Sequence, residues 1–511
     1  MPTTTTPAPR VGPAYLRRLA LTTLFPGFDG TTTPPPWLPR MAAEGLGGVV
    51  LFGRNVDPER GDAGVAQLTA ALRDAGPNLL VGIDEEGGDL TRLDASRGSA
   101  LPGNGALGAL DDPALTERVA AELATRLRQC GIDINFAPVA DVDSEVTNPV
   151  IGMRAFGATP DLVARQVAAF VTGQQGAGVA GAAKHFPGHG GTRDDSHYTV
   201  PVLERSLDNI QRTDLPPFRA AIKSDVQIVM TAHVVVPAID GSTPATLSPD
   251  TITGLLRDEL GYDGLVMTDG LDMHAISRGV GHAEAGVLAL LAGVDALCIG
   301  GDSTDPELPE AMAAALVEAV LEGRLPEERL AEAAARVERL RLWVHERRDE
   351  TAITNRAATG SAAVEAASQV ISVRGAVVLD AAPVVLELHD EPSPATGDVP
   401  WGIGAPIAAR LPGTVVVRLR EGGQDPDQVL RSVPDRPVIV CVRGTQRRPW
   451  QVEVVNTVRR RRPEVIVVDH GPDSTADVLG DHHVLTRGAA RVTAELVADL
   501  LTTPQGSLLS P

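Results

Sequence analysis

The sequence predicts an α/β protein built from two parallel-sheet units, and three observations support this. Short runs rich in Val, Ile and Leu alternate with amphipathic segments of helical period along most of the chain. The strand-like runs are apolar at nearly every position, as is typical of strands covered by helices on both faces. The chain has 511 residues, more than one compact domain usually holds. We therefore expect βαβ units distributed over more than one domain.

Eight strand-like runs precede residue 302. They occupy residues 21–27, 47–53, 79–84, 132–141, 178–186, 226–234, 264–270 and 294–301. Amphipathic segments such as DPALTERVAAELATRLRQ and TPDLVARQVAAFVTGQQ separate them, and several open on a residue suited to cap a helix. Eight strand–helix repeats over roughly 300 residues predict a (β/α)8 TIM barrel. The chain from Ser303 to about Arg348 is expected to continue as helix.

A polar segment, DETAITNRAATGSAA, then interrupts the pattern and is interpreted as a linker. Six further strand-like runs follow it, at residues 376–380, 383–390, 414–421, 437–444, 464–471 and 482–488. Interleaved helical segments make this a smaller, three-layer αβα open-sheet domain. The predicted organisation is a TIM-barrel catalytic domain over residues 1–347, a linker over 348–362 and a C-terminal αβα sandwich over 363–511.

Composition narrows the class of partner. The 66 acidic residues exceed the 45 Lys and Arg and give a net charge of −21, which argues against a nucleic-acid partner. The three cysteines, Cys130, Cys298 and Cys441, are far apart and show neither disulfide nor zinc-ribbon spacing. The first residues lack the pattern of a secretory signal, and no apolar run reaches the roughly 18 residues of a membrane span. We expect a cytoplasmic protein without a membrane partner, and the sequence leaves the oligomeric state open.

Titratable side chains stand at the ends of four predicted barrel strands. Asp84 ends the third strand, Lys184 and His185 end the fifth, His233 ends the sixth and Asp269 ends the seventh. TIM barrels place their active sites at the carboxyl ends of their strands. These residues are therefore expected to share one site.

The loop KHFPGHGGTRDDSHYTVP at residues 184–201 allows a metal site, an acid/base site or only a polar loop. His185 and His189 are four residues apart, but Phe-Pro-Gly between them cannot continue the helix that a zinc pair of this spacing needs. Asp195 and His197 are alternate residues, which point the same way in an extended segment and can meet. A carboxylate beside imidazole fixes its tautomer and raises its basicity. We interpret this pair as an acid/base device, with Asp269 as the candidate nucleophile and no metal.

Four motifs carry a family resemblance. The loop KHFPGHG…DSH, IDEEGGDLTR at 83–92, NPVIGMRAFG at 148–157 and GLVMTDGLDM at 264–273 occur in this order. Together they resemble glycoside hydrolase family 3, and within it the β-N-acetylglucosaminidase branch of NagZ-like enzymes. The resemblance covers roughly residues 12 to 345. The second domain matches only in kind.

The resemblance implies a role for each matching residue. Asp269 matches the catalytic nucleophile, and His197, paired with Asp195, matches the acid/base. The residues that match sugar-binding positions are Asp84, Arg92, Arg154, Lys184 and His185. No metal or organic cofactor is implied. Glu85 and Asp89 depart from the residue types common at their positions, and both are expected to point away from the sugar.

The expected function is that of a retaining exo-β-N-acetylglucosaminidase acting on peptidoglycan-derived muropeptides or chitooligosaccharides through a covalent glycosyl-aspartate. Several alternatives stay open at this point. Phosphate could replace water as acceptor, the sugar could be glucose, or the substrate's own acetamide could act as nucleophile. A non-enzymatic reading is a sugar-sensing binding protein, and the C-terminal domain could serve as a binding module.

Overall fold

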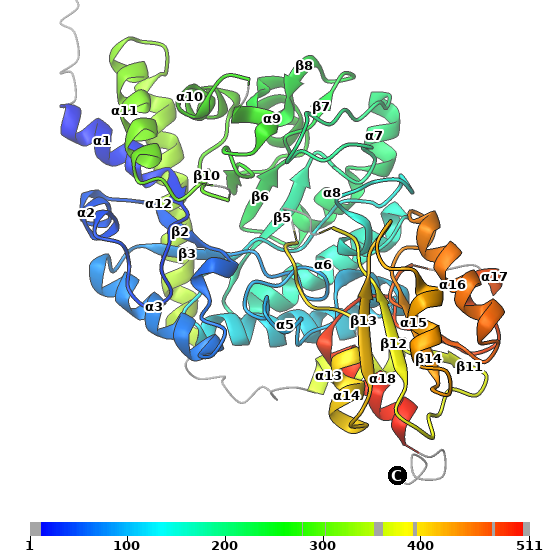
Figure 1. Cartoon of the computed structure of the whole chain (residues 1–511). Coiled ribbons are helices and arrows are strands. Elements are labelled where there is room, and N and C mark those ends of the chain that lie inside the picture. The colour runs from blue at the N-terminus through cyan, green and yellow to red at the C-terminus, as the bar shows by residue number, and fades with distance from the viewer. Residues whose placement is uncertain are drawn as a thin grey trace, which may run out of the picture.

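The chain forms two parallel sheets, each covered by helices, in a computed structural model that describes residues 12–277, 279–301, 303–351, 361–391, 396–472 and 476–503 (Figure 1). All eight strands expected in the N-terminal part are present. They are β1 (Leu24–Pro26), β2 (Gly48–Leu51), β3 (Leu80–Ile83), β4 (Ile134–Asn135), β5 (Ala180–Phe186), β6 (Ile228–Thr231), β9 (Leu265–Met267) and β10 (Leu297–Ile299). A hairpin that the sequence did not predict, β7 (Val235–Val236) and β8 (Asp240–Pro244), follows β6.

The strand pairing joins these eight strands into a ring. Six of them form one parallel sheet in the order β2-β3-β4-β5-β6-β9, and β1 pairs in parallel with β10. Single parallel bridges, Gly27 to Val50 and Met267 to Ala296, connect the two sheets at both ends. The parallel α/β architecture is confirmed, and its curled sheet is consistent with the expected TIM-like barrel.

Helices lie on the outside of the ring. They are α1 (Pro13–Thr22), α2 (Trp37–Glu44), α3 (Gly61–Ala75), α4 (Asn104–Leu110), α5 (Pro113–Gln129), α6 (Pro160–Gly176), α7 (Leu207–Thr213), α8 (Pro216–Lys223), α10 (His282–Ala292), α11 (Glu307–Leu321) and the π-helix η4 (Asp250–Glu259). The short helix α9 (His274–Ser277) follows β9 at the carboxyl ends of the strands. Helix α5 shows why they begin where they do. The Asp112 carboxylate accepts the N–H groups of Ala114 and Leu115, and Pro113 supplies the fixed φ of a first helical turn.

The long helix expected from Ser303 to about Arg348 is divided in two. Helix α11 ends at Leu321 and α12 (Glu327–Thr351) begins after a short turn. Gly323 in that turn has a φ of 76°, a left-handed conformation that glycine adopts without strain. Pro326 then precedes α12 and has no N–H to donate to the helix before it. Among the described residues no helix is both long and apolar enough to cross a membrane.

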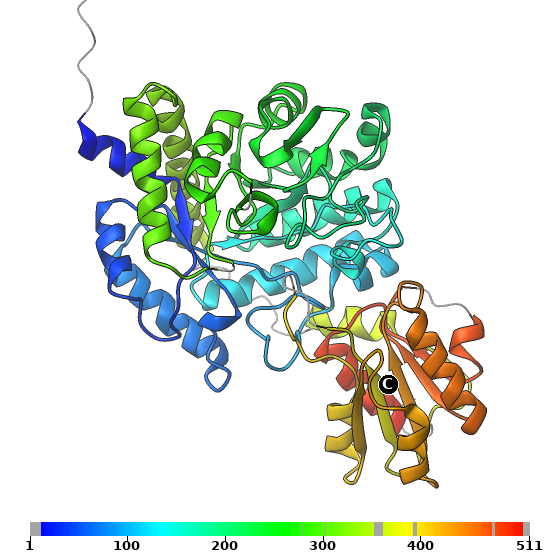
Figure 2. The ribbon, with the colours of Figure 1, turned by 45° about the horizontal axis from the view of Figure 1, so that its top comes forward.

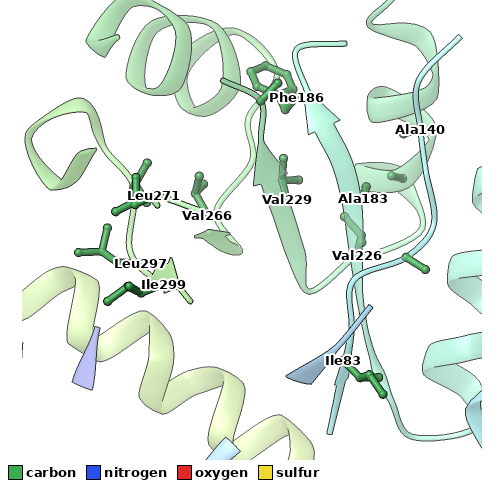
Figure 3. Packing of buried hydrophobic residues seen from close by; sticks show 14 of the residues in the cluster. Ile83, Ala140, Ala183, Phe186, Val226, Val229, Val266, Leu271, Leu297 and Ile299 are labelled. Atoms are coloured by element: carbon green, nitrogen blue, oxygen red, sulfur yellow. The ribbon is translucent and has the colours of Figure 1, made fainter. Parts of the chain in front are cut away.

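Side chains of the barrel strands alternate between two apolar clusters. Ile83, Ala183, Val229 and Val266 belong to the larger cluster, which also contains the inner faces of the surrounding helices (Figure 3). Their neighbours in the strands belong to a smaller cluster inside the ring. The inward-facing residues are Phe25, Val50, Leu80, Ile134, Phe136, Ala180, Ala182, Ile228, Met230, Leu265, Met267, Ala296 and Cys298. This period of two is what a pleated sheet buried on both faces imposes.

Helix α12 completes the interior. Val337, Leu340 and Val344 are almost fully buried and pack into the cluster inside the ring. The barrel interior is therefore a packed core beneath the carboxyl ends of the strands, closed from below by one helix.

The second sheet has six strands in the order β11-β16-β15-β14-β12-β13. Their bounds are β11 (Ser372–Arg374), β12 (Val384–Leu388), β13 (Val415–Leu419), β14 (Val438–Val442), β15 (Ile466–Asp469) and β16 (His483–Leu485). Only β11, at one edge of this described sheet, is antiparallel. Helices α14 (Gly404–Arg410) and α18 (Arg491–Thr502) pack on one face, and α15 (Pro426–Ser432), α16 (Pro449–Arg461) and α17 (Ala476–Leu479) pack on the other.

One strand of this sheet was predicted at the wrong place. The run AVVLD at residues 376–380 is not a strand, and β11 lies just before it. Val377 and Leu379 are nevertheless buried in the core, and the N–H of Leu379 is bound by the carbonyl of Leu501 in α18. The alternating apolar pattern thus reported burial against a helix instead of pairing with a strand.

The second sheet stands beside the barrel in both views (Figures 1 and 2). Helix α13 (Ser361–Val370) packs against α4 and α5 of the barrel and against α18. Helix α12 extends past residue 347 to Thr351, so the first part of the expected linker is helical. Residues 352–360 of that linker lie outside the described residues, and the domain boundaries stay predictions.

Replacing Leu340 by Ala should destabilise the barrel. The side chain is 3% exposed inside the ring, and deleting a buried leucine costs about 2–5 kcal/mol of free energy of unfolding. We expect a clearly lower midpoint of thermal unfolding. Leu342→Ala on the same helix is the matched control, because Leu342 is 62% exposed. Equal midpoints for the two variants would contradict the packing of α12 into the barrel.

Candidate active site

A cavity of about 270 Å³ opens at the carboxyl ends of the barrel strands. Its apolar floor comes from the cluster inside the ring and includes Phe136, Met230 and Cys298. Seven of the eight residues predicted for the site line this cavity, and they are Asp84, Arg92, Arg154, Lys184, His185, His197 and Asp269. The eighth, Asp195, lies behind His197. The structure therefore brings together side chains that are up to 185 positions apart in the sequence (from Asp84 to Asp269).

Lys184 is the centre of a buried charge network in one wall. The side chain is 2% exposed at the end of β5, and its Nζ lies 2.5 Å from Asp84 Oδ1 and 2.6 Å from Glu86 Oε1. Glu86 in turn binds Arg154 through both oxygens, at 3.0 and 2.8 Å. Arg92 approaches the other oxygen of Asp84 at 3.4 Å. Arg154 and Lys184 together hold the pKa of Glu86 well below its ordinary value, against the opposing effect of burial.

Asp269 follows β9 and carries an ionised carboxylate. Burial alone would raise its pKa, but the nearby imidazoles of His185, His233 and His197 and the N–H of Gly270 lower it to about 2. The Gly270 N–H donates to Asp269 Oδ1 at 2.8 Å. A carboxylate that keeps one oxygen free of this bond at the base of a cavity can act as a nucleophile or stabilise a cation.

His233 supports the turn that holds Asp269. It is fully buried after β6, and its Nε2–H donates to the carbonyl of Gly270 at 2.8 Å. Its Nδ1 lies 2.8 Å from Thr246 Oγ1. Burial lowers the pKa of His233, so the ring is neutral at neutral pH. It is a structural partner of the Gly270 peptide and does not line the cavity among the described residues.

Asp141 orients the loop that follows β5. Its Oδ2 lies 2.7 Å from His185 Nδ1, and its Oδ1 accepts the backbone N–H of His189 at 2.6 Å. Burial lowers the pKa of His189 to about 4, and its Nδ1 is held by Thr192 Oγ1. Both histidines thus already have protein partners on Nδ1. Among the described residues, no group of three or more His, Cys, Asp or Glu side chains is placed to hold a metal ion.

Asp195 and His197 meet, but not in the way that the sequence predicted. His197 Nδ1 lies 2.7 Å from Asp195 Oδ1, which also accepts the backbone N–H of His197 at 2.9 Å. The segment is a turn, in which the N–H groups of Tyr198 and Thr199 bind the Asp195 carbonyl. An aspartate that bonds a backbone N–H two residues on is a common turn former, and it places the imidazole against its own carboxylate.

The dyad is tuned toward the charged forms. Burial acts to lower the pKa of His197, but the hydrogen bond and charge of Asp195 outweigh it and raise that pKa above its ordinary value. The same contact lowers the pKa of Asp195 against the effect of burial. His197 can therefore carry a proton at neutral pH and present Nε2 to the cavity.

Glu85 and Asp89 do not occur among the described residues that line the cavity. Glu85 points to the opposite side of the chain from Asp84 and Glu86, and its Oε2 accepts the N–H groups of Arg92 and Leu93. Burial raises the pKa of Glu85 to about 7. Asp89 binds the Arg443 side chain and the Ala489 N–H, which follow strands β14 and β16 of the second sheet. The expectation that both acids point away from the cavity agrees with this geometry.

Sequence reasoning missed two acids of the site. Glu86 follows Asp84 by two positions after a strand, so the period of two that placed Asp84 could have found it. Asp141 is the last residue of the predicted fourth strand, the same signal that identified Asp84 and Asp269. Neither was predicted because an acid that binds a buried partner cannot be told from a solvated one until the fold shows the partner.

Comparison with known proteins decides the family. Residues 39–340 match the description "Glycosyl hydrolase family 3 N terminal domain". The chain belongs to glycosyl hydrolase family 3. The resemblance inferred from the four motifs is confirmed, and the match spans the barrel strands from β2 to β10 together with the cavity.

Three relatives of this family member show how far the likeness extends. "Beta-hexosaminidase A" of Pseudoalteromonas piscicida is 35% identical over 349 residues, which is 64% of this chain and 58% of that protein. "Beta-hexosaminidase" of Pseudomonas aeruginosa (strain LESB58) is 38% identical over 270 residues, 52% of this chain and 77% of that protein. The structure of a family 3 β-N-acetylglucosaminidase from Paenibacillus sp. str. FPU-7 aligns with a TM-score of 0.82 at 30% identity, covering 95% of this chain and 96% of that one.

Neighbouring acids Glu85 and Glu86 should respond oppositely to neutralisation. Glu85 has a pKa raised from 4.5 to about 7, so its ionisation destabilises the fold progressively as pH rises through this window. Each pKa unit corresponds to about 1.4 kcal/mol. We expect Glu85→Gln to raise the thermal unfolding midpoint relative to wild type at pH 8, with little gain at pH 4.5.

Glu86→Gln is the matched control for that measurement. The pKa of Glu86 is lowered, so its charge stabilises the fold above its ordinary pKa, and removing it leaves Lys184 and Arg154 with a neutral partner. This variant should unfold at a lower temperature than wild type at pH 8. A Glu85→Gln midpoint that falls at pH 8 in the same way would contradict the raised pKa assigned to the buried Glu85.

Proposed function

We propose that this protein is a retaining exo-β-N-acetylglucosaminidase that removes terminal β-linked GlcNAc. The observation that carries the proposal is the pairing of an ionised Asp269 with an Asp195-bound His197 on the wall of one cavity. Retaining glycoside hydrolysis needs a nucleophile on one side of the anomeric carbon and a group that gives and takes a proton on the other. The names of the relatives support GlcNAc as the sugar.

The reaction takes two displacements. In the first, Asp269 Oδ attacks the anomeric carbon while protonated His197 gives its Nε2 proton to the glycosidic oxygen, so the C–O bond breaks and the leaving alcohol departs neutral. In the second displacement, neutral His197 takes a proton from water while the water oxygen attacks the same carbon. The glycosyl–aspartate bond then breaks, and Asp269 returns to a carboxylate. Asp195 holds the ring in the tautomer that both steps need.

The polar wall of the cavity binds the sugar. Asp84 accepts hydrogen bonds from hydroxyl groups, since a carboxylate offers several acceptor positions beyond those used by Lys184 and Arg92. Arg92, Arg154 and Lys184 donate to sugar oxygens. Because these side chains are fixed by one another before substrate binds, little conformational entropy is lost on binding.

We further propose the two-domain organisation predicted from the sequence, with the barrel as catalytic domain. Peptidoglycan-derived muropeptides or chitooligosaccharides are the proposed substrates. The mixed charge around the cavity supports a polar, sugar-based substrate. Water is the proposed acceptor, and a cytoplasmic location stays a prediction.

Turnover of an aryl β-N-acetylglucosaminide tests the function directly. We expect release of free GlcNAc at a rate that inorganic phosphate does not change, and little turnover of the matching β-glucoside. Sugar 1-phosphate among the products would instead identify a phosphorylase. Equal rates on both glycosides would identify a glucosidase-type member of the family.

Replacing Asp269 by Ala should abolish turnover. Loss of the nucleophile removes the covalent step, and nucleophile deletions in other enzymes cost about four orders of magnitude in kcat or more. Steady-state kinetics on the aryl glycoside measures this. Asp263→Ala is the matched control, because Asp263 is 75% exposed just before β9 and far from the cavity lining. Near-normal rates for the Asp269 variant would exclude the mechanism.

Replacing Asp195 by Asn should shift the pH dependence. His197 must be protonated for the first displacement, and Asp195 is what raises its pKa. We expect the alkaline limb of kcat/KM to move to lower pH by about one unit or more. Asp269 should not contribute to any change in the acid limb of the same profile, because its pKa of about 2 keeps it ionised there. An alkaline limb at the wild-type pH would show that another group is the acid.

A further inference from the structure

Two loops that carry sugar-contacting groups are held from outside the barrel. We call residues 84–103, after β3, the β3 loop, and residues 136–154, after β4, the β4 loop. The β3 loop contributes Asp84 and Arg92 to the cavity, and the β4 loop contributes Arg154. Each loop is also bound by groups from the part of the chain that forms the second sheet. These groups lie hundreds of residues after the loops in the sequence.

Arg443 holds the β3 loop. It follows β14, and its Nη2 lies 2.5 Å from Asp89 Oδ2, a carboxylate whose side chain is 7% exposed. The backbone N–H of Ala489 donates to the other oxygen of Asp89 at 3.3 Å. The Arg443 guanidinium also lies over the ring of Trp401 at 5.6 Å from its centroid. The Arg443 guanidinium is thus held by Trp401 of the C-terminal part as well as by Asp89 of the barrel.

Arg447 holds the β4 loop from the same segment. Its Nη2 binds both oxygens of Asp143, at 3.0 and 2.8 Å, and its Nε donates to the carbonyl of Val146. Gly152, in the turn that ends at Arg154, has a φ of 48°. The backbone angle favours glycine, and a Cβ at this position would lie 2.4 Å from Arg447 Nη1, so the missing side chain leaves room for this guanidinium.

The two loops are coupled inside the site. Arg154 of the β4 loop binds Glu86 of the β3 loop through both oxygens, and Asn104 Nδ2 donates to the Arg154 carbonyl at 2.7 Å. Glu86 shares Lys184 with Asp84. A shift of either loop therefore changes the positions of both Asp84 and Arg154, which are the acid and the guanidinium proposed to bind the sugar.

We propose that Arg443 and Arg447 are positioning residues for sugar recognition, acting through Asp89 and Asp143 on the β3 and β4 loops. The inference rests on the proposed function and deepens it, because it assigns the second sheet a role in the same site. Neither arginine lines the catalytic cavity among the described residues. Charge-assisted, partly buried pairs of this kind fix geometry, and a displacement of about 1 Å in a binding group can cost on the order of 10²-fold in rate.

The kinetic test compares Arg443→Ala, Arg447→Ala and the double variant with Arg448→Ala. Arg448 is the matched control, since it lies next to Arg447 and pairs with Asp390 within the second sheet's own unit. On the aryl β-N-acetylglucosaminide we expect KM to rise by about tenfold for each single variant with a smaller change in kcat. The double variant should lose less than the product of the two losses, because both act on one coupled wall. Lysine at either position should restore part of the loss.

Hydrogen–deuterium exchange provides a readout that does not need turnover. Backbone amides of the β3 and β4 loops should exchange faster in Arg443→Ala and Arg447→Ala than in wild type or in Arg448→Ala. If wild type showed no turnover of any aryl glycoside, the proposed function would fail while this measurement still judged the loops. Unchanged exchange in both loops, or KM values that match the Arg448→Ala control, would overturn the proposal.

Discussion

The ion pair between Lys184 and Glu86 is the contact on which the rest of the site depends. Both side chains are almost fully withdrawn from water, and a buried charge without a partner costs several kcal/mol. Lys184 comes from strand β5 and Glu86 from the loop after β3, so this one contact joins two barrel elements across β4. Asp84 also binds Lys184, and Arg154 also binds Glu86, so each member of the central pair has a second partner of opposite charge. The polar wall is a single cooperative unit, and its geometry exists before any sugar arrives.

Alternation along the chain after β3 separates two chemistries. Asp84 and Glu86 face the cations of the cavity, while Glu85 between them turns toward the backbone of Arg92 and Leu93. The pKa of Glu85 is therefore raised from the ordinary glutamate value, whereas the pKa of its neighbour Glu86 is lowered. The reason is the partner and not the depth of burial, since both are buried. Similarly, the Gly270 N–H and the charge of nearby imidazoles lower the pKa of Asp269 against the effect of burial.

Much of the barrel and its site could be predicted from the sequence because the relevant signals are local. Apolar runs marked the eight strands, and Asp84, Lys184 and Asp269 stood at or near the carboxyl ends of such runs. The Asp195–His197 contact was predicted for the wrong conformation, since a turn and an extended segment can bring the same two side chains together. The AVVLD run was misplaced because burial against α18 produces the same alternation as pairing in a sheet.

Contacts between the two sheets could not have been predicted in this way. Arg443 and Asp89 are 354 positions apart, and nothing in either neighbourhood distinguishes a bridging arginine from a solvated one. The same holds for Glu86 and Arg154, whose motifs looked independent. Such pairs are defined only once the fold has fixed which surfaces face each other. Similarity to family 3 supplied the roles expected of the cavity residues, but it said nothing of these partners.

The packed floor of the barrel has a consequence for the order of events. Val337, Leu340 and Val344 of α12 and the apolar layer above them close the cavity from below, so its mouth lies at the carboxyl ends of the strands. A sugar seated at the bottom cannot leave while the remainder of its chain occupies that mouth. In the proposed reaction the leaving group must therefore depart first, the attacking water must enter by the vacated path, and the freed sugar must leave last. Under the proposed function the protein would release its substrate after every cut, because each cycle would end with an empty cavity.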